Sequence, residues 1–137
     1  EGDADAYPLL LLPYDSMRLA SGNIGSPPFL VKTVEDTILQ KNDVLVEVNP
    51  VTAQKYGLAE GKYATLNTPR GGARVKIHLF DGIMPDIVAI PRGLGHTAYN
   101  QFLADKGVNY NALSAPVEDP ATGMNAAWGI RAKLAKA

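Results

Sequence analysis

The segment from Pro91 to His96 carries the residue types best suited to ligand binding, because it combines two glycines with a histidine. Gly93 and Gly95 have no side chains, so a ligand could approach the backbone N–H groups, which bind phosphates and carbonyl groups well. His96 offers a ring nitrogen as a hydrogen-bonding group, and Thr97, the next residue, is a further candidate. Taken alone, these residues favour a tight turn with a half-exposed histidine, and ligand binding is the second interpretation.

Two other segments hold polar side chains that suit a binding loop. The amide of Asn111 offers donors and an acceptor together, and the carboxylate of Asp119 can accept from amino and imino N–H groups. Pro120 follows Asp119, so a turn in which the carboxylate caps its own loop is the alternative. The segment 14–28 is rich in Ser, Gly, Asn and Pro, and loops of that length inside a small domain are usually functional. Its candidate hydrogen-bonding residues are Ser16, Asn23 and Ser26.

Composition excludes several classes of function within these residues. The 137-residue chain has 13 basic and 14 acidic residues, a balance that gives no support to a nucleic-acid or membrane-surface partner. It has no cysteine, which excludes a thiolate-bound iron–sulfur cluster, a cysteine zinc site and a catalytic thiol. The longest apolar run, 9–12, is too short for membrane insertion, and no signal peptide is expected. We interpret residues 1–6 as a linker from a larger polypeptide and 7–137 as one domain.

Alternation of apolar and polar residues between Gly and Pro turns predicts the strands of the domain. The predicted strands cover 7–12, 44–48, 63–68, 73–79, 87–90 and 128–134. Short helices are predicted at 33–40, at 50–57 with Asn49 as the N-cap, and at 99–104. His78 lies on the wet face of its predicted strand, so we expect it at the surface. About six strands without βαβ spacing favour a closed barrel with helical insertions.

Four segments, taken in order, form a more specific pattern than any one of them. They are LPYDS at 12–16 continuing to 30, VNPVTA at 48–53 continuing to 61, PRGLGH at 91–96, and GVNYNAL at 107–113 continuing to EDPATG at 118–123. The pattern resembles the C-terminal molybdopterin-dinucleotide-binding domain of the dimethyl-sulfoxide-reductase family of molybdopterin oxidoreductases. The first segment is most similar to the polysulfide, thiosulfate and quinone-reductase branch. The resemblance implies a mainly β fold with short helices, a six-stranded double-psi β-barrel.

The resemblance also implies a function. The domain would hold molybdopterin guanine dinucleotide, in its bis form, over the active site of a larger respiratory enzyme, whose other domains would hold the molybdenum or tungsten. The chain alone is then expected to be inactive. Its implied partners are the remaining domains of the parent enzyme, an iron–sulfur subunit and a membrane anchor, on the periplasmic side of a bacterial membrane. The implied cofactor contacts are Ser16, Asn23, Ser26, Gly93, Gly95, His96, Thr97, Asn111 and Asp119.

Two alternatives stay open at this stage. Ser26 stands where asparagine is common in the branch, so the domain could have lost the cofactor and serve as a structural interface in a membrane-bound respiratory complex. Self-processing decarboxylases also use a double-psi barrel with a Gly-Ser cleavage point, and Gly25-Ser26 is the only such pair in the chain. An intact mass of the purified chain would exclude that second alternative.

Overall fold

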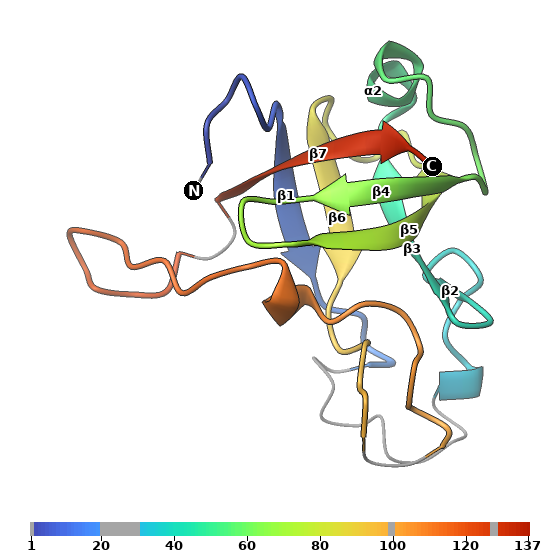
Figure 1. Ribbon diagram of the computed structural model, residues 1–137. Helices are drawn as coiled ribbons and strands as arrows, with labels where there is room; N and C mark the ends of the chain where they lie inside the picture. Colours follow the sequence, from blue (N-terminus) through green and yellow to red (C-terminus); the bar gives the residue numbers. More distant parts are fainter. Residues whose placement is uncertain (1, 20–30, 99–100, 127–128) are drawn as a thin grey trace.

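The chain folds as a β-barrel with long loops gathered at one end (Figure 1). The computed structural model describes residues 2–19, 31–98, 101–126 and 129–137. The strands of this part of the chain are β1 (Leu9–Tyr14), β2 (Leu39–Gln40), β3 (Asp43–Val48), β4 (Tyr63–Asn67), β5 (Gly72–Leu79), β6 (Ile87–Pro91) and β7 (Ile130–Lys136). Two helical elements lie between strands, the helix α2 (Pro50–Lys55) and the 3-10 turn η2 (Tyr110–Ala112), and residues 31–32 are helical as well.

Six of these strands close the barrel in the order β3-β5-β4-β7-β1-β6, because β6 also pairs with β3. The pairs β1–β6 and β3–β5 are parallel, and the other pairs around the ring are antiparallel. β2 adds to β3 as a two-residue strand. Closure pairs the strand edges that an open sheet would expose. The structure therefore confirms the predicted mainly β fold with a six-stranded barrel.

The barrel interior is filled by alternate residues of each strand, as the period of two requires. In β1, Leu9 and Leu11 are fully buried, whereas Leu10 and Leu12 point outward and are about two-fifths exposed. In β3, Val44, Val46 and Val48 lie in the core, and Leu45, on the opposite face, is buried as well. A core of aliphatic side chains with defined rotamers makes the barrel a rigid base for the loops.

The helix α2 begins as predicted. Asn49 is its N-cap, and the Asn49 side chain accepts a hydrogen bond from the backbone N–H of Val51 at 2.9 Å. The same side chain donates to the carbonyl oxygen of Ile83 at 2.7 Å, which ties the helix to the turn before β6. Gly57 takes a left-handed φ of +65° after the helix, as its position after a C-terminus predicts. No helix among the described residues is long and apolar enough to cross a membrane.

The predicted helix over 33–40 is wrong, because this segment forms turns that lead into β2. The backbone N–H groups of Ile38 and Leu39 both donate to the carbonyl oxygen of Glu35, and Leu39 then pairs with Val44 in β3. Val34 and Ile38 are buried. Their spacing of four residues is the same as on one face of a helix. The tight turn after β2, in which Lys41 has a φ of +57°, instead brings 39–40 back to pair with β3, and this pairing replaces the helix.

Other sequence predictions need smaller corrections. Residues 101–104 form a turn ending in a bridge from Ala104 to His96, so the predicted helix at 99–104 is wrong over its described part. β1 runs 9–14 where 7–12 was predicted, and β7 begins at Ile130; Trp128 lies outside the described residues. His78 was predicted at the surface, but its side chain is only 22% exposed, and its Nδ1 atom lies 3.2 Å from Glu60 Oε1.

Candidate functional site

Two parallel strands deliver the main loops of the site to one end of the barrel. Tyr14 ends β1 and Pro91 ends β6, and these two residues are register partners. The backbone N–H of Arg92 donates to the carbonyl oxygen of Tyr14 at 2.9 Å, which extends the pairing by one residue. Because parallel strands finish at the same edge, the loop after β1 and the glycine loop after β6 start side by side.

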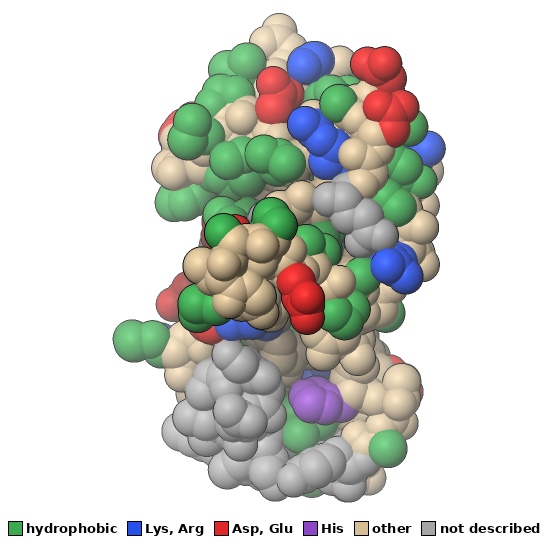
Figure 2. All heavy atoms as spheres, turned by 90° about the vertical axis from the view of Figure 1, so that its left-hand side faces the viewer, with side chains coloured by type: hydrophobic (Ala, Val, Ile, Leu, Met, Phe, Trp, Pro, Cys, Tyr) green, Lys and Arg blue, Asp and Glu red, His purple; other side chains and the backbone are tan. Residues whose placement is uncertain are grey.

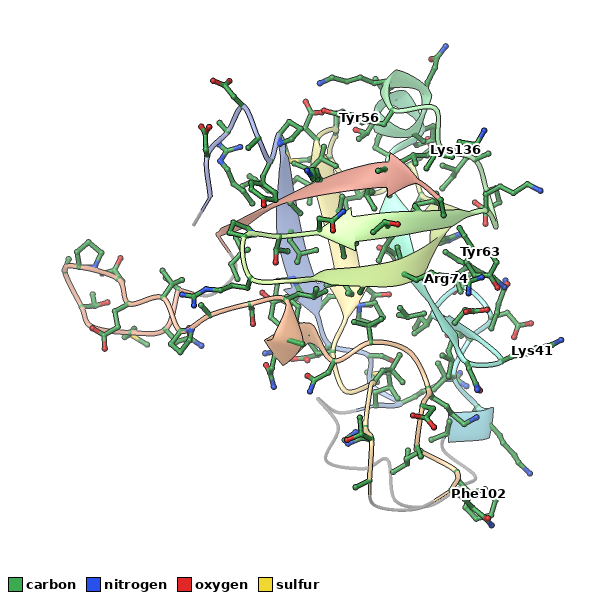
Figure 3. The ribbon with its side chains drawn as sticks, in the orientation of Figure 1. Lys41, Tyr56, Tyr63, Arg74, Phe102 and Lys136 are labelled. Atoms are coloured by element: carbon green, nitrogen blue, oxygen red, sulfur yellow. The ribbon has the colours of Figure 1, made fainter. Side chains whose placement is uncertain are left out.

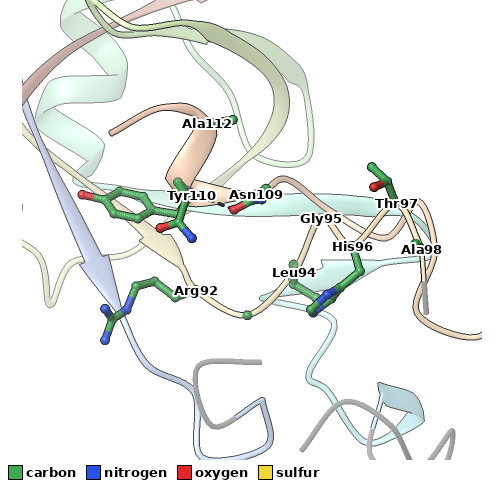
Figure 4. A pocket seen from close by; sticks show the side chains of 11 residues that line it. Arg92, Leu94, Gly95, His96, Thr97, Ala98, Asn109, Tyr110 and Ala112 are labelled. Carbon is green, nitrogen blue, oxygen red and sulfur yellow. Dashed lines mark hydrogen bonds between the residues drawn. The ribbon is translucent and has the colours of Figure 1, made fainter. Parts of the chain in front are cut away.

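The glycine loop (residues 91–96) and the η2 turn border a cavity of about 630 Å³, a volume within the range of small-molecule sites. It is lined by Arg92, Gly93, Leu94, Gly95, His96, Thr97, Ala98, Asn109, Tyr110, Asn111 and Ala112. Figure 4 shows Arg92 and Tyr110 toward one end of this cavity and Thr97 and Ala98 toward the other. His96 and Asn111, predicted from segments far apart in the chain, thus share one cavity.

Gly95 has a structural reason to be glycine. Its φ is +79°, and a Cβ atom at this position would lie 2.0 Å from the backbone nitrogen of Asn109. Its own N–H donates to the carbonyl oxygen of Lys106 at 2.7 Å. The sequence interpretation was that the missing side chain makes room for a ligand. The structure shows that the η2 segment fills that space, so Gly95 joins two walls of the cavity.

The histidine of the loop is held through its backbone. The carbonyl oxygen of His96 accepts from the N–H of Asp105 at 2.9 Å, and His96 bridges to Ala104. The residue is half-buried and its Nε2 atom is screened from solvent. Thr97, next to it, is exposed. The loop therefore fixes the position of an imidazole in the cavity wall and places a hydroxyl at the rim.

The η2 turn presents the second wall. The side chain of Asn109 accepts from the N–H of Asn111 at 3.0 Å and so caps the turn, which leaves the Asn111 side chain exposed at the cavity. Below it, the hydroxyl of Thr68 donates to the carbonyl oxygen of Leu113 at 2.8 Å in a buried contact. Since Thr68 belongs to the turn between β4 and β5, this bond fastens η2 to the barrel.

A second cavity of about 470 Å³ adjoins the first. The two share Arg92, Tyr110 and Asn111, and the second is completed by Pro13 and by residues from Ser114 to Asn125. Figure 2 views the molecule from the side on which this last segment projects, and it shows a histidine side chain in a recess below the projection. Because both linings include Tyr110 and Arg92, these residues lie at the boundary between the two cavities, which together form a divided groove.

Burial raises the pKa of Tyr110, although the hydrogen bond with Ser114 and the charge of the Arg92 guanidinium oppose the shift.

Asp119 is engaged by its own loop. One carboxylate oxygen accepts from the N–H groups of Ala121 and Thr122 and from the Thr122 hydroxyl, at 2.8–3.0 Å. These bonds, led by the hydroxyl, lower the pKa of Asp119. This is the loop-capping arrangement that the Asp-Pro sequence suggested, and Asp119 lines neither cavity. Contact between Asp119 and a ligand stays a prediction.

The candidates of the first loop are only partly described. Asn23, Ser26 and the Gly25-Ser26 pair lie outside the described residues. Ser16 is described, and its hydroxyl accepts from the N–H of Arg18 at 3.3 Å, which makes it a turn residue. Ser16 follows Asp15, whose carboxylate binds the Arg92 guanidinium through two bonds of 2.9 and 2.6 Å. The first loop thus reaches the cavity through Asp15.

Sequence reasoning missed Arg92 and Tyr110, which line both cavities. Both lie inside the segments that carry the family resemblance, so the signal was available, but an arginine after a strand and a tyrosine in an irregular segment have no distinctive spacing. A separate contact between polar side chains lies elsewhere. Tyr63, whose ring contacts Arg74, lies on the barrel away from Phe102 among the loops (Figure 3). Within the described residues, no group of three His, Asp or Glu side chains could hold a metal ion.

The sequence matches a family described as "Molydopterin dinucleotide binding domain" over residues 30–130. It is 37% identical over 134 residues to the menaquinone reductase, molybdopterin-binding-like subunit of Nitratidesulfovibrio vulgaris, covering 98% of this chain and 19% of that protein. It is 31% identical to the arsenate respiratory reductase molybdopterin-containing subunit ArrA of a Shewanella species, covering 98% of this chain and 17% of the relative. The acetylene hydratase of Pelobacter acetylenicus shares the fold, with a TM-score of 0.70 at 22% identity over 98% of this chain and 19% of that one.

The chain thus spans about a fifth of the length of the relatives it matches. The family match covers most of the barrel and the whole of the glycine loop and η2, which are the elements that build the cavity. On these grounds the chain belongs to the molybdopterin-dinucleotide-binding domain family, the domain carried by the molybdopterin subunits of the dimethyl-sulfoxide-reductase family.

Proposed function

We propose that this domain covers a molybdopterin guanine dinucleotide in the active site of a larger respiratory oxidoreductase. The observation that carries the proposal is the divided groove, two adjoining cavities joined at Arg92, Tyr110 and Asn111. A dinucleotide is long and has two heterocyclic ends joined by phosphates, so a groove with two compartments suits its shape. Contacts of this kind position a cofactor, while the cofactor carries the reaction.

The donor and acceptor groups of the first cavity suit the polar edge of a pterin. The amide of Asn111 supplies a donor and an acceptor on one side, and His96 supplies a ring nitrogen on the other. Gly93, at a φ of +94°, keeps the loop backbone open to a planar ligand. The molybdenum or tungsten of a bound cofactor would supply the redox chemistry, and its protein ligands would come from other domains.

The isolated chain is then expected to bind the dinucleotide weakly and to have no oxidoreductase activity. Both cavities are broad hollows at the surface, and Thr97 and Asn111 are exposed at the rim. Hydrogen bonds that remain accessible to solvent contribute roughly 0.5–1.5 kcal/mol each to the free energy of binding. A few such bonds, set against the entropy of fixing a flexible ligand, leave an affinity near 1 mM, or about −4 kcal/mol.

The rest of the parent enzyme is the partner that this arrangement requires. Relatives are about five times longer than this chain, so the opposite wall of the cofactor site would come from their other domains. Leu10 and Leu12, two-fifths exposed on the outer face of β1, offer apolar area for such packing. Since one relative is named a respiratory reductase, we further propose an electron-transfer partner, an iron–sulfur subunit with a membrane anchor. We propose the periplasmic side of the membrane as the location.

The test is an NMR titration of the ¹⁵N-labelled chain with two probes, 6-hydroxymethylpterin and guanosine diphosphate. We expect millimolar binding, with shifts confined to residues 92–98 and 109–125 and absent from the β4–β5 hairpin. Asn111→Ala should weaken pterin binding, while Asn67→Ala, in β4, should not. Absence of shifts in both loops would refute cofactor binding, and micromolar affinity would refute the division of binding between domains.

One observation favours a second function. The relative that is 37% identical is named "molybdopterin-binding-like", whereas the one that is 31% identical is named "molybdopterin-containing". The domain would then keep the barrel as a structural interface in a membrane-bound respiratory complex and bind no cofactor. Metal and pterin analysis of the purified parent enzyme distinguishes the two functions, because only the first requires molybdenum or tungsten together with extractable pterin.

A further inference from the structure

The ion pair between Asp15 and Arg92 joins the first residues beyond two parallel strands. Arg92 Nε donates to Asp15 Oδ1 at 2.9 Å, and Arg92 Nη2 donates to Asp15 Oδ2 at 2.6 Å. The backbone N–H of Arg92 is held at the same time by the carbonyl oxygen of Tyr14. Main chain and side chain are therefore both fixed, and a bidentate pair of this kind sets the plane of the guanidinium.

This ion pair is too exposed to contribute much to stability. The side chains of Arg92 and Asp15 are 44% and 47% exposed, and pairs with such exposure add little to the free energy of unfolding because water and salt screen them. Arginine is also charged at every pH at which the domain is folded, so Asp15 is not needed to keep the guanidinium protonated. What the carboxylate determines is where the guanidinium points.

The guanidinium lies at the boundary of the two cavities. Arg92 is one of the three residues common to both linings, and Figure 4 shows its side chain extending toward the Tyr110 end of the glycine-loop cavity. The bonds to Asp15 use two of the five guanidinium N–H groups. The other three are not used by this ion pair, and planar N–H groups of this kind match phosphate oxygens.

We propose that Asp15 is a positioning residue that aims Arg92 at the diphosphate link between the two halves of the bound dinucleotide. The inference rests on the proposed function and goes beyond it by assigning the junction of the groove to an anionic group. Each compartment then takes one heterocycle, and the remaining N–H groups of the arginine between them donate to oxygens of the diphosphate link. Without Asp15, the guanidinium keeps its charge but samples many directions, so it loses selectivity for a ligand that carries the diphosphate.

The experiment compares guanosine diphosphate with guanosine, which lacks the diphosphate, by NMR titration of the 137-residue chain. Asp15→Asn removes the carboxylate charge. Asp15→Glu keeps a carboxylate and serves as the rescue. Asp86→Asn is the matched control, because Asp86 also forms an exposed ion pair, with Lys55 at 3.2 Å, and lines neither cavity. Hydrogen exchange of the Arg92 Nε–H, measured without ligand, reports directly on the fixed guanidinium.

Asp15→Asn is expected to weaken guanosine diphosphate binding about fivefold to tenfold, as loss of one charge-assisted contact does, and to leave guanosine binding unchanged. Its Arg92 Nε–H should exchange faster, Asp15→Glu should recover most of the selectivity, and Asp86→Asn should resemble the wild type. Two results would overturn the positioning role alone. The first is an equal loss of affinity for guanosine diphosphate and guanosine in Asp15→Asn. The second requires one more variant, Arg92→Gln: if it loses guanosine diphosphate binding while Asp15→Asn keeps it, Arg92 acts without Asp15. A wild-type chain that binds neither guanosine diphosphate nor pterin would overturn the proposed function as well.

Discussion

Replacing Gly95 by alanine should destabilise the domain more than the same replacement at Gly61, another loop glycine with a left-handed φ. A Cβ at this position would meet the backbone nitrogen of Asn109 at 2.0 Å and the carbonyl carbon of Val108 at 2.4 Å. Both are backbone atoms, so no side-chain rotation relieves the clash. The glycine loop and the η2 segment must separate, and the cavity between them must change shape.

The cost has two parts. An alanine with a left-handed φ loses roughly 1–2 kcal/mol relative to glycine. Separation of the two segments breaks the bond from Gly95 N–H to the Lys106 carbonyl and the bond from Asp105 N–H to the His96 carbonyl, each of which contributes roughly 0.5–1.5 kcal/mol. We therefore expect Gly95→Ala to lower the free energy of unfolding by roughly 2–5 kcal/mol, a large part of the stability of a domain of this size.

The variant Gly61→Ala separates the cost of a left-handed backbone conformation from the cost of a steric clash at the new Cβ atom. Gly61 has a similar φ of +68°, but a Cβ there would meet no atom within 4 Å, so its loss should be limited to roughly 1–2 kcal/mol. Urea unfolding of both variants, followed by circular dichroism, measures the difference. If Gly95→Ala were no less stable than Gly61→Ala, the close contact between the glycine loop and η2 would not exist in solution, and the cavity described above would be wrong.

Three further predictions concern other parts of the molecule. Asn49→Ala should cost roughly 2–3 kcal/mol in urea unfolding, because it removes the α2 cap and leaves the Ile83 carbonyl without its donor; a loss below about 1 kcal/mol would contradict this. Burial raises the pKa of Glu47, so the folded chain binds more protons than the unfolded chain and loses this contribution as pH rises through the folded pKa. Glu47→Gln should therefore raise the melting temperature at pH 7 and flatten its decline from pH 5, and an unchanged profile would refute the shift. Asp119→Ala should loosen the loop at 119–124, seen as faster amide exchange, and should leave pterin binding unchanged, because Asp119 lines neither cavity; weaker pterin binding would show instead that Asp119 contacts the ligand.

The strands were predictable because their period of two is set by the barrel itself. Each strand has one face in a core of aliphatic side chains, so the alternation of apolar and polar residues in β5 follows from burial. The predicted helix over 33–40 could not be excluded from the alternation pattern. Turns bring Val34 and Ile38 into the core, and a spacing of four residues between buried side chains is expected both for a helix and for successive turns. Only the pairing of Leu39 with Val44 decides between them.

The candidate site was predictable in its loops but not in its contacts. Glycines and polar residues between strands indicated where a rigid scaffold could aim side chains, and His96 and Asn111 do share a cavity. The role of Gly95 depends on which segment packs against it, and the role of Arg92 depends on the parallel pairing that brings Asp15 beside it. Both are long-range contacts, which the composition of a segment does not encode.

The architecture also explains why such a site would need the rest of an enzyme. A closed barrel uses its interior for the aliphatic core, so a ligand must bind outside the core, and the candidate site lies on the loops at one end of the barrel. Here, loops after the parallel strands β1 and β6 meet the η2 turn and form two cavities open to solvent. On the function proposed above, the barrel supplies one polar wall and a directed arginine, and a second wall from other domains must exclude water. Each hydrogen bond to the cofactor would then gain strength only on assembly, because its worth rises as water is removed.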